Sequence, residues 1–325
     1  MKRGFISGST PIADLHMDVL YAHTPESFVK GSSRHQTDLP RMLASGVRLA
    51  VFSLFASPRS GNRSTWLEEI RNQIEKFKRI VTLSDGRVAL IRDPANVRQN
   101  IEKEILSVML EIEGLHPVGY SLYDVELLID EGVSVVTVCW NNSNRFATSA
   151  VDAASGEDRG LSPLGRELVR ILNERKIIID CSHASDATFF DILDISDRPP
   201  VLSHSGVRHF RNIPRNASDE VLSAIESTGS IIGINLCPSF LSRRARKHIT
   251  VQTVVEQILY LSERFSPDIL ALGSDLEGIR YLPSDMKGVE DIPLIFERLS
   301  GKMSEEAVSG VAFDNFFRFF TSVRE

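Results

Sequence analysis

Histidines and acidic residues stand in short groups at intervals along the sequence. Six of them have the chemistry of a metal site, namely His16, Asp18, Glu113, His183, His204 and Asp275. Imidazole and carboxylate groups bind Zn²⁺ and similar divalent ions in proteins. Six ligands exceed what one catalytic zinc ion usually takes, and they fit two ions that share a bridging carboxylate, with a water or hydroxide between them. The set therefore predicts a two-metal centre that activates water.

Each of these residues lies at the end of an apolar run that predicts a β-strand. Eight such runs occur, at 12–19, 47–56, 106–113, 133–140, 177–183, 200–204, 231–237 and 269–275. Side chains alternate along a strand, so His16 and Asp18 point to the same face. Helical patterns lie between most of the runs, for example at 66–81, 164–176 and 251–265. Eight strand–helix units predict an α/β fold, a (β/α)8 TIM barrel whose catalytic residues lie at the C-terminal ends of the strands.

The length of 325 residues allows either two average domains or one barrel with insertions. No linker rich in Pro, Gly or Ser divides the sequence, and one metal centre needs both His16 and Asp275. We therefore expect residues 1–325 to form a single barrel domain. Insertions at its rim are expected at 58–85, 87–100 and 141–162. An open, doubly wound sheet is the alternative, but no GxGxxG or Walker sequence is present to favour it.

The composition, with 42% hydrophobic and 25% charged residues, is that of an ordinary soluble protein. A net charge of −6 argues against nucleic acid as a partner, and we interpret the basic run at 243–248 as a solvated loop. No run of about 18 apolar residues predicts a membrane span. The three cysteines, Cys139, Cys181 and Cys237, are widely spaced, which indicates reduced thiols and a cytoplasmic protein.

Several motifs follow the order found in the membrane (renal) dipeptidase family of metallopeptidases, which is related to the amidohydrolase barrels. They stand at 14–18 (DLHMD), 111–116 (EIEGLH), 140–142 (WNN), 160–165 (GLSPLG), 180–186 (DCSHASD), 201–205 (VLSHS), 214–216 (PRN), 273–278 (GSDLEG) and 314–316 (DNF). The sequence resembles this family over nearly its whole length and is similar to its soluble bacterial-type members. The resemblance implies a metal-dependent barrel hydrolase that cleaves dipeptides.

The resemblance also implies a role for each metal ligand. His16 and Asp18 would bind the first metal, and His183 and His204 would bind the second. Glu113 would bridge both. The expected cofactors are two divalent ions, most naturally Zn²⁺, although such ligands also accept manganese. The ions would lower the pKa of a bridging water so that hydroxide is available near neutral pH.

Proton transfer and substrate binding follow from the same resemblance. Asp275 would take the proton of the nucleophilic water and pass it toward the leaving amine, so Asp275 and Glu113 are the predicted catalytic residues. Arg215 would hold the C-terminal carboxylate of the dipeptide, because its planar fork suits bidentate recognition. The family accepts a D-residue in the second position, which implies L-Xaa-D-Xaa substrates. The other expected substrate contacts are Trp140, Asn141 and His116.

Three positions near the site depart from the family pattern. Trp140 occupies the position of a histidine that contacts substrate in some members, which leaves the side-chain specificity open. Leu115 replaces the second glycine after Glu113, so a different local backbone is expected. Glu111 faces the same way as Glu113 by strand parity, one layer deeper, and a buried carboxylate needs a partner. Arg48 is the expected partner.

Two other functions fit a barrel of this kind. Related barrels hydrolyse another small amide, lactam or lactone, but they usually carry a carboxylated lysine at a strand end, and no strand-end lysine occurs here. A non-catalytic binding or scaffold barrel would have lost one or more metal ligands, and none of the six is lost.

Two further features lie outside the predicted site. The phenylalanine-rich segment at 313–320 is expected to pack on the barrel, and packing against a second copy in a homodimer is the alternative. The remaining loop histidines are expected to be exposed to solvent, namely His23, His35, His209 and His248.

Overall fold

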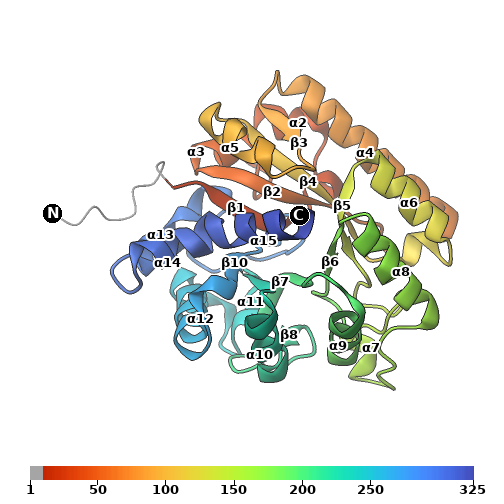
Figure 1. Cartoon of the computed structure of the whole chain (residues 1–325). Coiled ribbons are helices and arrows are strands. Elements are labelled where there is room, and N and C mark those ends of the chain that lie inside the picture. The colour runs from red at the N-terminus through yellow and green to blue at the C-terminus, as the bar shows by residue number, and fades with distance from the viewer. Residues whose placement is uncertain (1–9) are drawn as a thin grey trace.

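A ring of parallel β-strands forms the centre of the protein (Figure 1). The computed structural model describes residues 10–325. The strands, in their order around the ring, are β1 (Ile12–Met17), β2 (Val47–Leu54), β4 (Leu106–Glu113), β5 (Val133–Thr137), β6 (Ile178–Asp180), β7 (Val201–Val207), β9 (Ile231–Ile234) and β10 (Leu270–Leu272). Two short strands extend the sheet, because β3 (Val88–Leu90) pairs with β4 and β8 (Asn216–Ala217) pairs with β7. All eight predicted strands are present, which confirms the predicted barrel.

Helices follow the strands and cover the outside of the ring (Figure 1). They are α1 (Val19–Ala22), α2 (Pro25–Lys30), α3 (Leu39–Ala44), α4 (Arg63–Leu83), α5 (Ala95–Glu102), α6 (Leu122–Glu131), α7 (Ala150–Ala153), α8 (Pro163–Glu174), α9 (Asp186–Ile195), α10 (Asp219–Thr228), α11 (Pro238–Leu241), α12 (Val251–Arg264), α13 (Pro293–Leu299), α14 (Glu305–Ser309) and α15 (Asn315–Arg324). Single turns of 3-10 or π helix lie at His116–Val118, Arg246–His248, Pro267–Ile269, Val289–Asp291 and Gly310–Asp314. The helices predicted at 66–81, 164–176 and 251–265 correspond to α4, α8 and α12. Within residues 10–325, every helix is too short or too polar to cross a lipid bilayer.

The strands consist mainly of apolar, β-branched residues because both faces of a parallel sheet are buried. Every residue of β4 and β7 is buried, including the polar ones near their C-terminal ends. Six strands end two or three residues earlier than predicted, among them β5 at Thr137 and β6 at Asp180. Trp140 and His183 therefore lie on loops beyond the strands, at the rim of the barrel.

The ring closes between β10 and β1 through hydrogen bonds made by the residues that follow β10. The Asp275 N–H donates to the His16 carbonyl at 3.0 Å. The Asp18 N–H donates to the Leu276 carbonyl at 2.9 Å. Three of the predicted metal ligands thus stand on the two segments that close the barrel.

The C-terminal helix α15 lies across the end of the barrel where the strands begin (Figure 1). Its residues Phe316, Phe319 and Phe320 are buried against inward-facing strand residues such as Leu15 and Val51. The expectation that the phenylalanine-rich C-terminus packs on the barrel is confirmed. This apolar floor separates one end of the barrel from solvent and leaves the other end for the site.

We expect Phe320→Ala to destabilise the protein by about 3–5 kcal/mol, the usual effect of truncating a buried phenylalanine. Phe320 is 0% exposed, whereas Phe190 is 39% exposed and serves as the matched control. Phe190→Ala should change the free energy of unfolding by less than about 0.5 kcal/mol. Urea denaturation of both variants measures the difference. Equal effects would contradict the role of α15 as the floor of the barrel.

Candidate metal centre

Three imidazoles converge on one carboxylate where the strands end. Glu113 Oε1 lies 3.0 Å from His183 Nε2 and 3.7 Å from His204 Nε2. It lies 3.9 Å from His16 Nε2. The Nε2 atoms of His183 and His204 are 3.0 Å apart. All four side chains are buried. These separations are close to the edge of about 3.3 Å in a tetrahedron around a zinc ion with bonds of about 2.0–2.1 Å.

The outer nitrogens of His183 and His204 are held by hydrogen-bond acceptors. Asn141 Oδ1 lies 2.9 Å from His183 Nδ1, and Ser203 Oγ lies 2.8 Å from His204 Nδ1. Because Ser203 Oγ donates its own proton to Asp180 Oδ2 at 2.9 Å, it accepts from the histidine. Each ring therefore carries its proton on Nδ1 and turns the lone pair of Nε2 inward, which is the state that binds a metal.

Glu111 holds His16 from the deeper layer of the barrel. Its Oε2 lies 2.7 Å from His16 Nδ1, and its Oε1 accepts a hydrogen bond from the Thr137 hydroxyl at 2.6 Å. All three side chains are completely buried. Since the carboxylate accepts from Nδ1, the ring of His16 presents Nε2 to the cluster.

The expected pairing of Glu111 with Arg48 is wrong. Glu111 shares the inward-facing parity of Met109, which lies in the core inside the ring. Arg48 shares the opposite parity of Phe52, which packs in the core outside the ring. Arg48 donates instead to backbone carbonyl groups at 2.9 and 3.0 Å.

The remaining predicted ligands gather on the other side of His16. Asp18 Oδ2 lies 3.5 Å from His16 Nε2, and an oxygen of Asp275 lies within 4.8 Å of both residues. Asn235 Nδ2 donates to Asp275 Oδ2 at 2.9 Å and orients that carboxylate. A Cβ atom at Gly278 would collide with oxygens of both Asp18 and Asp275. Glycine at this position therefore keeps the space between the carboxylates open.

The residues present fit divalent metal ions. His16 Nε2 is buried and has no hydrogen-bond partner, an arrangement that is unfavourable unless a ligand completes it. Two overlapping groups of ligand atoms meet at this nitrogen, one with Glu113 and His204 and one with Asp18 and Asp275. Nitrogen lone pairs and carboxylate oxygens that point at one another are the donor set of zinc and related metals.

Burial controls the protonation of the site. It raises the pKa of Asp275 to about 6 and raises the pKa of Glu113 well above its usual value. It lowers the pKa of His183 and of His204 well below 6.5, and the charge of Arg215 adds to both shifts. The two imidazoles are therefore neutral near pH 7, and burial without a cation disfavours the ionised form of both carboxyl groups.

Arg215 lies beside the histidines and is only 7% exposed. Its Nη1 donates to the Ser182 carbonyl, and its Nη2 donates to the His204 carbonyl at 3.2 Å. The guanidinium carbon lies 5.3 Å from the centre of the Phe240 ring. The Nε–H is buried without a partner, so it remains available to an acidic ligand.

Trp140 and His116 occupy different parts of the predicted pocket. The centre of the Trp140 ring lies 6.1 Å from that of His183 and 5.1 Å from that of Phe55. His116 Nε2 bonds to the Ala56 carbonyl at 2.7 Å, and burial lowers the pKa of its ring. Trp140 thus stands next to the metal ligands, whereas His116 is anchored to the segment after β2.

The segment after Glu113 needs only one glycine. Gly114 has a φ of 81°, in the left-handed region, and a Cβ there would lie 3.0 Å from the Trp140 backbone nitrogen. Leu115 has a φ of −95°, which any residue adopts, and its side chain is buried. Leucine therefore fits the second position without backbone strain.

Sequence reasoning missed the residues that hold the ligands in place. They are Thr137, Asp180, Ser203, Asn235 and Gly278. Asp180 and Ser203 stand inside motifs quoted for the histidines next to them, and Gly278 ends the motif of Asp275. A polar residue at a predicted strand end, such as Asn235 in the run at 231–237, was a usable signal. Thr137 carried none, because threonine is common in strands.

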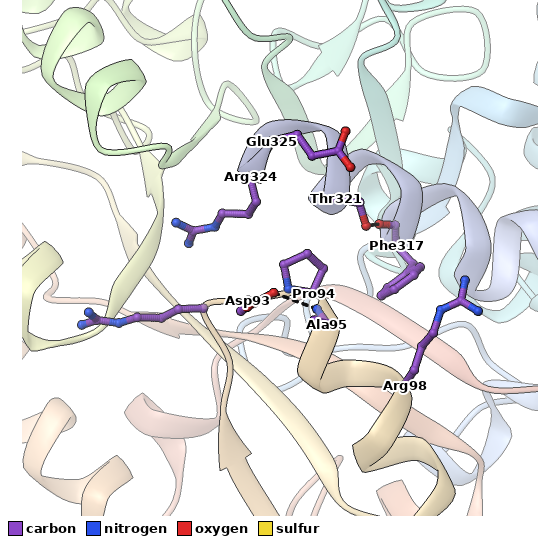
Figure 2. Close-up of a pocket in the computed structure, with 9 residues that line it drawn as sticks. Asp93, Pro94, Ala95, Arg98, Phe317, Thr321, Arg324 and Glu325 are labelled. Atoms are coloured by element: carbon purple, nitrogen blue, oxygen red, sulfur yellow. Dashed lines mark hydrogen bonds between the residues drawn. The ribbon is translucent and has the colours of Figure 1, made fainter.

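A further pocket, of about 640 Å³, lies between α5 and α15 at the opposite end of the barrel (Figure 2). It is lined by Arg92, Asp93, Pro94, Ala95, Arg98, Phe317, Thr321, Arg324 and Glu325. Arg92 donates to two backbone carbonyls at 2.9 and 2.7 Å, and Arg98 lies over the Phe317 ring. Figure 2 shows the guanidinium groups of Arg98 and Arg324 pointing away from one another. The positive charges do not converge, so we assign this pocket no catalytic role.

Comparisons with known proteins point to one family. The sequence matches the family model of the membrane dipeptidases, peptidase family M19, over residues 3–325. It is 29% identical over 343 residues to an uncharacterized dipeptidase of Schizosaccharomyces pombe, with 100% of this chain and 83% of the relative covered. It is 33% identical over 224 residues to dipeptidase tcpJ of Claviceps purpurea, with 68% of this chain and 51% of the relative covered.

Solved structures confirm the fold. A metallo peptidase from Rhodobacter sphaeroides, crystallised with a phosphinate mimic of the dipeptide L-Ala-D-Ala, superposes with a TM-score of 0.88. It is 22% identical in sequence, and the match covers 96% of this chain and 98% of that one.

We expect metal binding to release protons, because burial raises the pKa of Asp275 to about 6 and that of Glu113 well above its usual value, and a metal takes only the ionised form of each. The affinity for Zn²⁺ should therefore rise from about pH 6 to about pH 8. Isothermal titration of metal-free protein in two buffers with different ionisation enthalpies measures the protons released, with at least about one expected at pH 6. Asp275→Asn should release fewer. A binding enthalpy that is independent of the buffer would contradict this account.

Proposed function

The chain belongs to the membrane dipeptidase family, peptidase family M19, and is a metallo-dipeptidase, and we propose that it cleaves the peptide bond of dipeptides at a centre of two Zn²⁺ ions. The observation that carries the proposal is the convergence of three imidazole nitrogens on Glu113 Oε1. In the proposal His16 and Asp18 hold the first ion, His183 and His204 hold the second, and Glu113 bridges them.

When bound, two such ions would supply a water of lowered pKa and an electrophile for the carbonyl of the scissile bond. Asp275 accepts the proton of that water and passes it to the leaving amine. A pKa of about 6 suits this exchange, because a group that titrates near the working pH can both take and give a proton. Asn235, whose amide donates to Asp275 Oδ2, keeps the other carboxylate oxygen turned toward His16 and Asp18.

Arg215 binds the C-terminal carboxylate of the substrate in this proposal. Its buried Nε–H has no partner in the protein, and a carboxylate is the group that a guanidinium binds most strongly. A longer peptide has no carboxylate at that distance from the scissile bond, which explains a preference for dipeptides. Trp140 and Phe55 form an aromatic wall beside His183, against which a substrate side chain packs.

The proposed substrates include L-Xaa-D-Xaa dipeptides. The family resemblance supports this choice, and so does the L-Ala-D-Ala mimic bound to the Rhodobacter sphaeroides protein. The proposal treats residues 1–325 as one catalytic domain. A cytoplasmic location and a homodimer remain predictions from the sequence.

A panel of L,L and L,D dipeptides, assayed on protein loaded with Zn²⁺, tests the proposed function. We expect turnover of several dipeptides, L-Ala-D-Ala among them, with release of both amino acids followed by chromatography. Protein that holds two metals and cleaves no dipeptide would contradict the proposal. Turnover confined to small lactams or lactones in the same assay would favour the alternative amidohydrolase reaction.

His183→Ala and His209→Ala are the matched variants for this assay. His183→Ala removes a ring that lies 3.0 Å from Glu113, so it should lower kcat/KM by at least about a hundredfold and reduce the bound zinc. The His209 ring stacks on Tyr260 at 4.3 Å, outside the cluster, and its removal should leave kcat/KM nearly unchanged.

Arg215→Lys should raise KM much more than it lowers kcat, because lysine keeps the charge but not the fork that binds a carboxylate. We expect kcat/KM for a dipeptide to fall roughly 10- to 100-fold, the effect of losing a hydrogen bond to a charged group. The C-terminal amide of the same dipeptide is the control substrate, since it lacks the carboxylate. The variant and the unaltered enzyme should cleave that amide at similar rates. An equal loss on both substrates would show that Arg215 acts on the fold and not on the substrate.

A further inference from the structure

A second group of metal-capable side chains lies beside the catalytic centre. It consists of His23, between α1 and α2, His35, before α3, and Glu277, after β10. The His23 side chain is 0% exposed, that of Glu277 is 7% exposed and that of His35 is 24% exposed. The expectation that His23 is an exposed loop histidine is therefore wrong, because the chain folds Glu277, 254 residues later, against it.

Both imidazoles face the same carboxylate, at distances longer than a charge-assisted hydrogen bond. His23 Nε2 lies 3.3 Å from Glu277 Oε1, and His35 Nδ1 lies 3.3 Å from Glu277 Oε2. An imidazolium–carboxylate hydrogen bond usually measures about 2.7–2.9 Å, and the His16–Glu111 pair of this chain has 2.7 Å. A spacing of about 3.3 Å is instead the edge of a tetrahedron around a zinc ion. The catalytic ligands show the same kind of spacing, 3.0–3.9 Å.

The hydrogen bonds of Ser27 set the direction of the His23 ring. Ser27 Oγ donates to the Thr24 carbonyl at 2.9 Å and lies 3.2 Å from His23 Nδ1. It therefore accepts the Nδ1 proton, and the lone pair of Nε2 faces a carboxylate oxygen. Two lone pairs at this distance repel one another unless a proton or a cation lies between them.

A positive charge on both rings does not satisfy the group. The His23 and His35 rings are stacked with centres 3.7 Å apart. Two imidazolium ions at that distance would repel one another, and the single carboxylate of Glu277 would leave one positive charge without a partner in a site that is largely buried. One divalent cation satisfies both nitrogens and the carboxylate together.

Neighbouring residues hold the three side chains in position. The Thr37 N–H donates to Glu277 Oε1 at 2.8 Å, and Gln36 Oε1 accepts from the Glu277 N–H at 2.8 Å. Arg41 Nη2 donates to the His35 carbonyl at 2.8 Å. The segment between α2 and α3 is thus built around Glu277, so the site needs no rearrangement to take an ion.

We propose that His23, His35 and Glu277 form a metal site distinct from the catalytic centre, which takes a divalent transition metal such as Zn²⁺. Two imidazoles and one carboxylate are a common ligand set for such ions. Solvent reaches the site along the partly exposed His35, and water completes the coordination. The ion joins the segment before α3 to the loop after β10, two residues from Asp275, and so braces the loop that carries the proposed base.

The test counts the zinc bound by the full-length protein. Each protein is equilibrated with Zn²⁺, separated from free ions by gel filtration and analysed by mass spectrometry for zinc per chain. We expect His35→Ala and Glu277→Gln each to hold one equivalent fewer than the unaltered protein. His209→Ala is the matched control, because its ring stacks on Tyr260, away from any carboxylate of the site, and it should hold as much zinc as the unaltered protein.

Glu277→Gln separates loss of metal from loss of folding, since glutamine keeps the size of the side chain and an acceptor for the Thr37 N–H. In the presence of a chelator its Tm should match that of the unaltered protein, and Zn²⁺ should raise its Tm by less. Equal zinc in the unaltered protein and both variants would overturn the proposal and leave a hydrogen-bonded network. Because the readout is a difference of one equivalent, it does not depend on whether the catalytic centre cleaves dipeptides.

Discussion

Each of the three histidines in the candidate metal centre has an outer nitrogen, Nδ1, that needs a hydrogen-bond acceptor within the protein. This constraint orders the layer beneath the site. Thr137 Oγ lies 2.6 Å from Glu111 Oε1 and 2.8 Å from Asp180 Oδ2, although a hydroxyl has only one proton to donate. Thr137 thus joins Glu111, which holds His16, to Asp180, which holds Ser203 beside His204. Backbone N–H groups of Ser182 and Ser203 also donate to Asp180 Oδ1, and burial raises the pKa of Glu111 to about 7.

Closure of the barrel and assembly of the site depend on the same contacts. Asp14 Oδ1 accepts from the Ser274 N–H at 2.9 Å, across 260 residues of sequence, and from the His16 N–H at 3.2 Å. The first strand and the last must therefore meet before His16 and Asp275 can come together in one site. A barrel that is only partly closed lacks one side of the site, and the loop-closure entropy of this contact is among the largest in the fold.

The sequence was sufficient for the features that depend on period and order along the chain. The apolar runs predicted all eight strands of the ring, and the alternation along β1 put His16 and Asp18 on one face. Contacts across the barrel could not be predicted in this way. Parity showed that Glu111 faces inward but not which residue meets it, so Arg48 was a wrong partner and His16 is the right one. The burial of His23 depends likewise on a residue far along the chain.

The loop after β10 shows how the barrel holds a reactive carboxylate in place. Asp275 and Glu277 have φ values of 61° and 72°, a left-handed backbone that costs about 1–2 kcal/mol for each residue with a side chain. Such a conformation persists only where the surroundings determine it. Asn235 holds the Asp275 carboxylate, and Gln36 accepts from the Glu277 N–H. Loosening either contact would let the backbone relax and would move Asp275 away from His16, so residues around position 277 that touch no substrate still set the position of the proposed base.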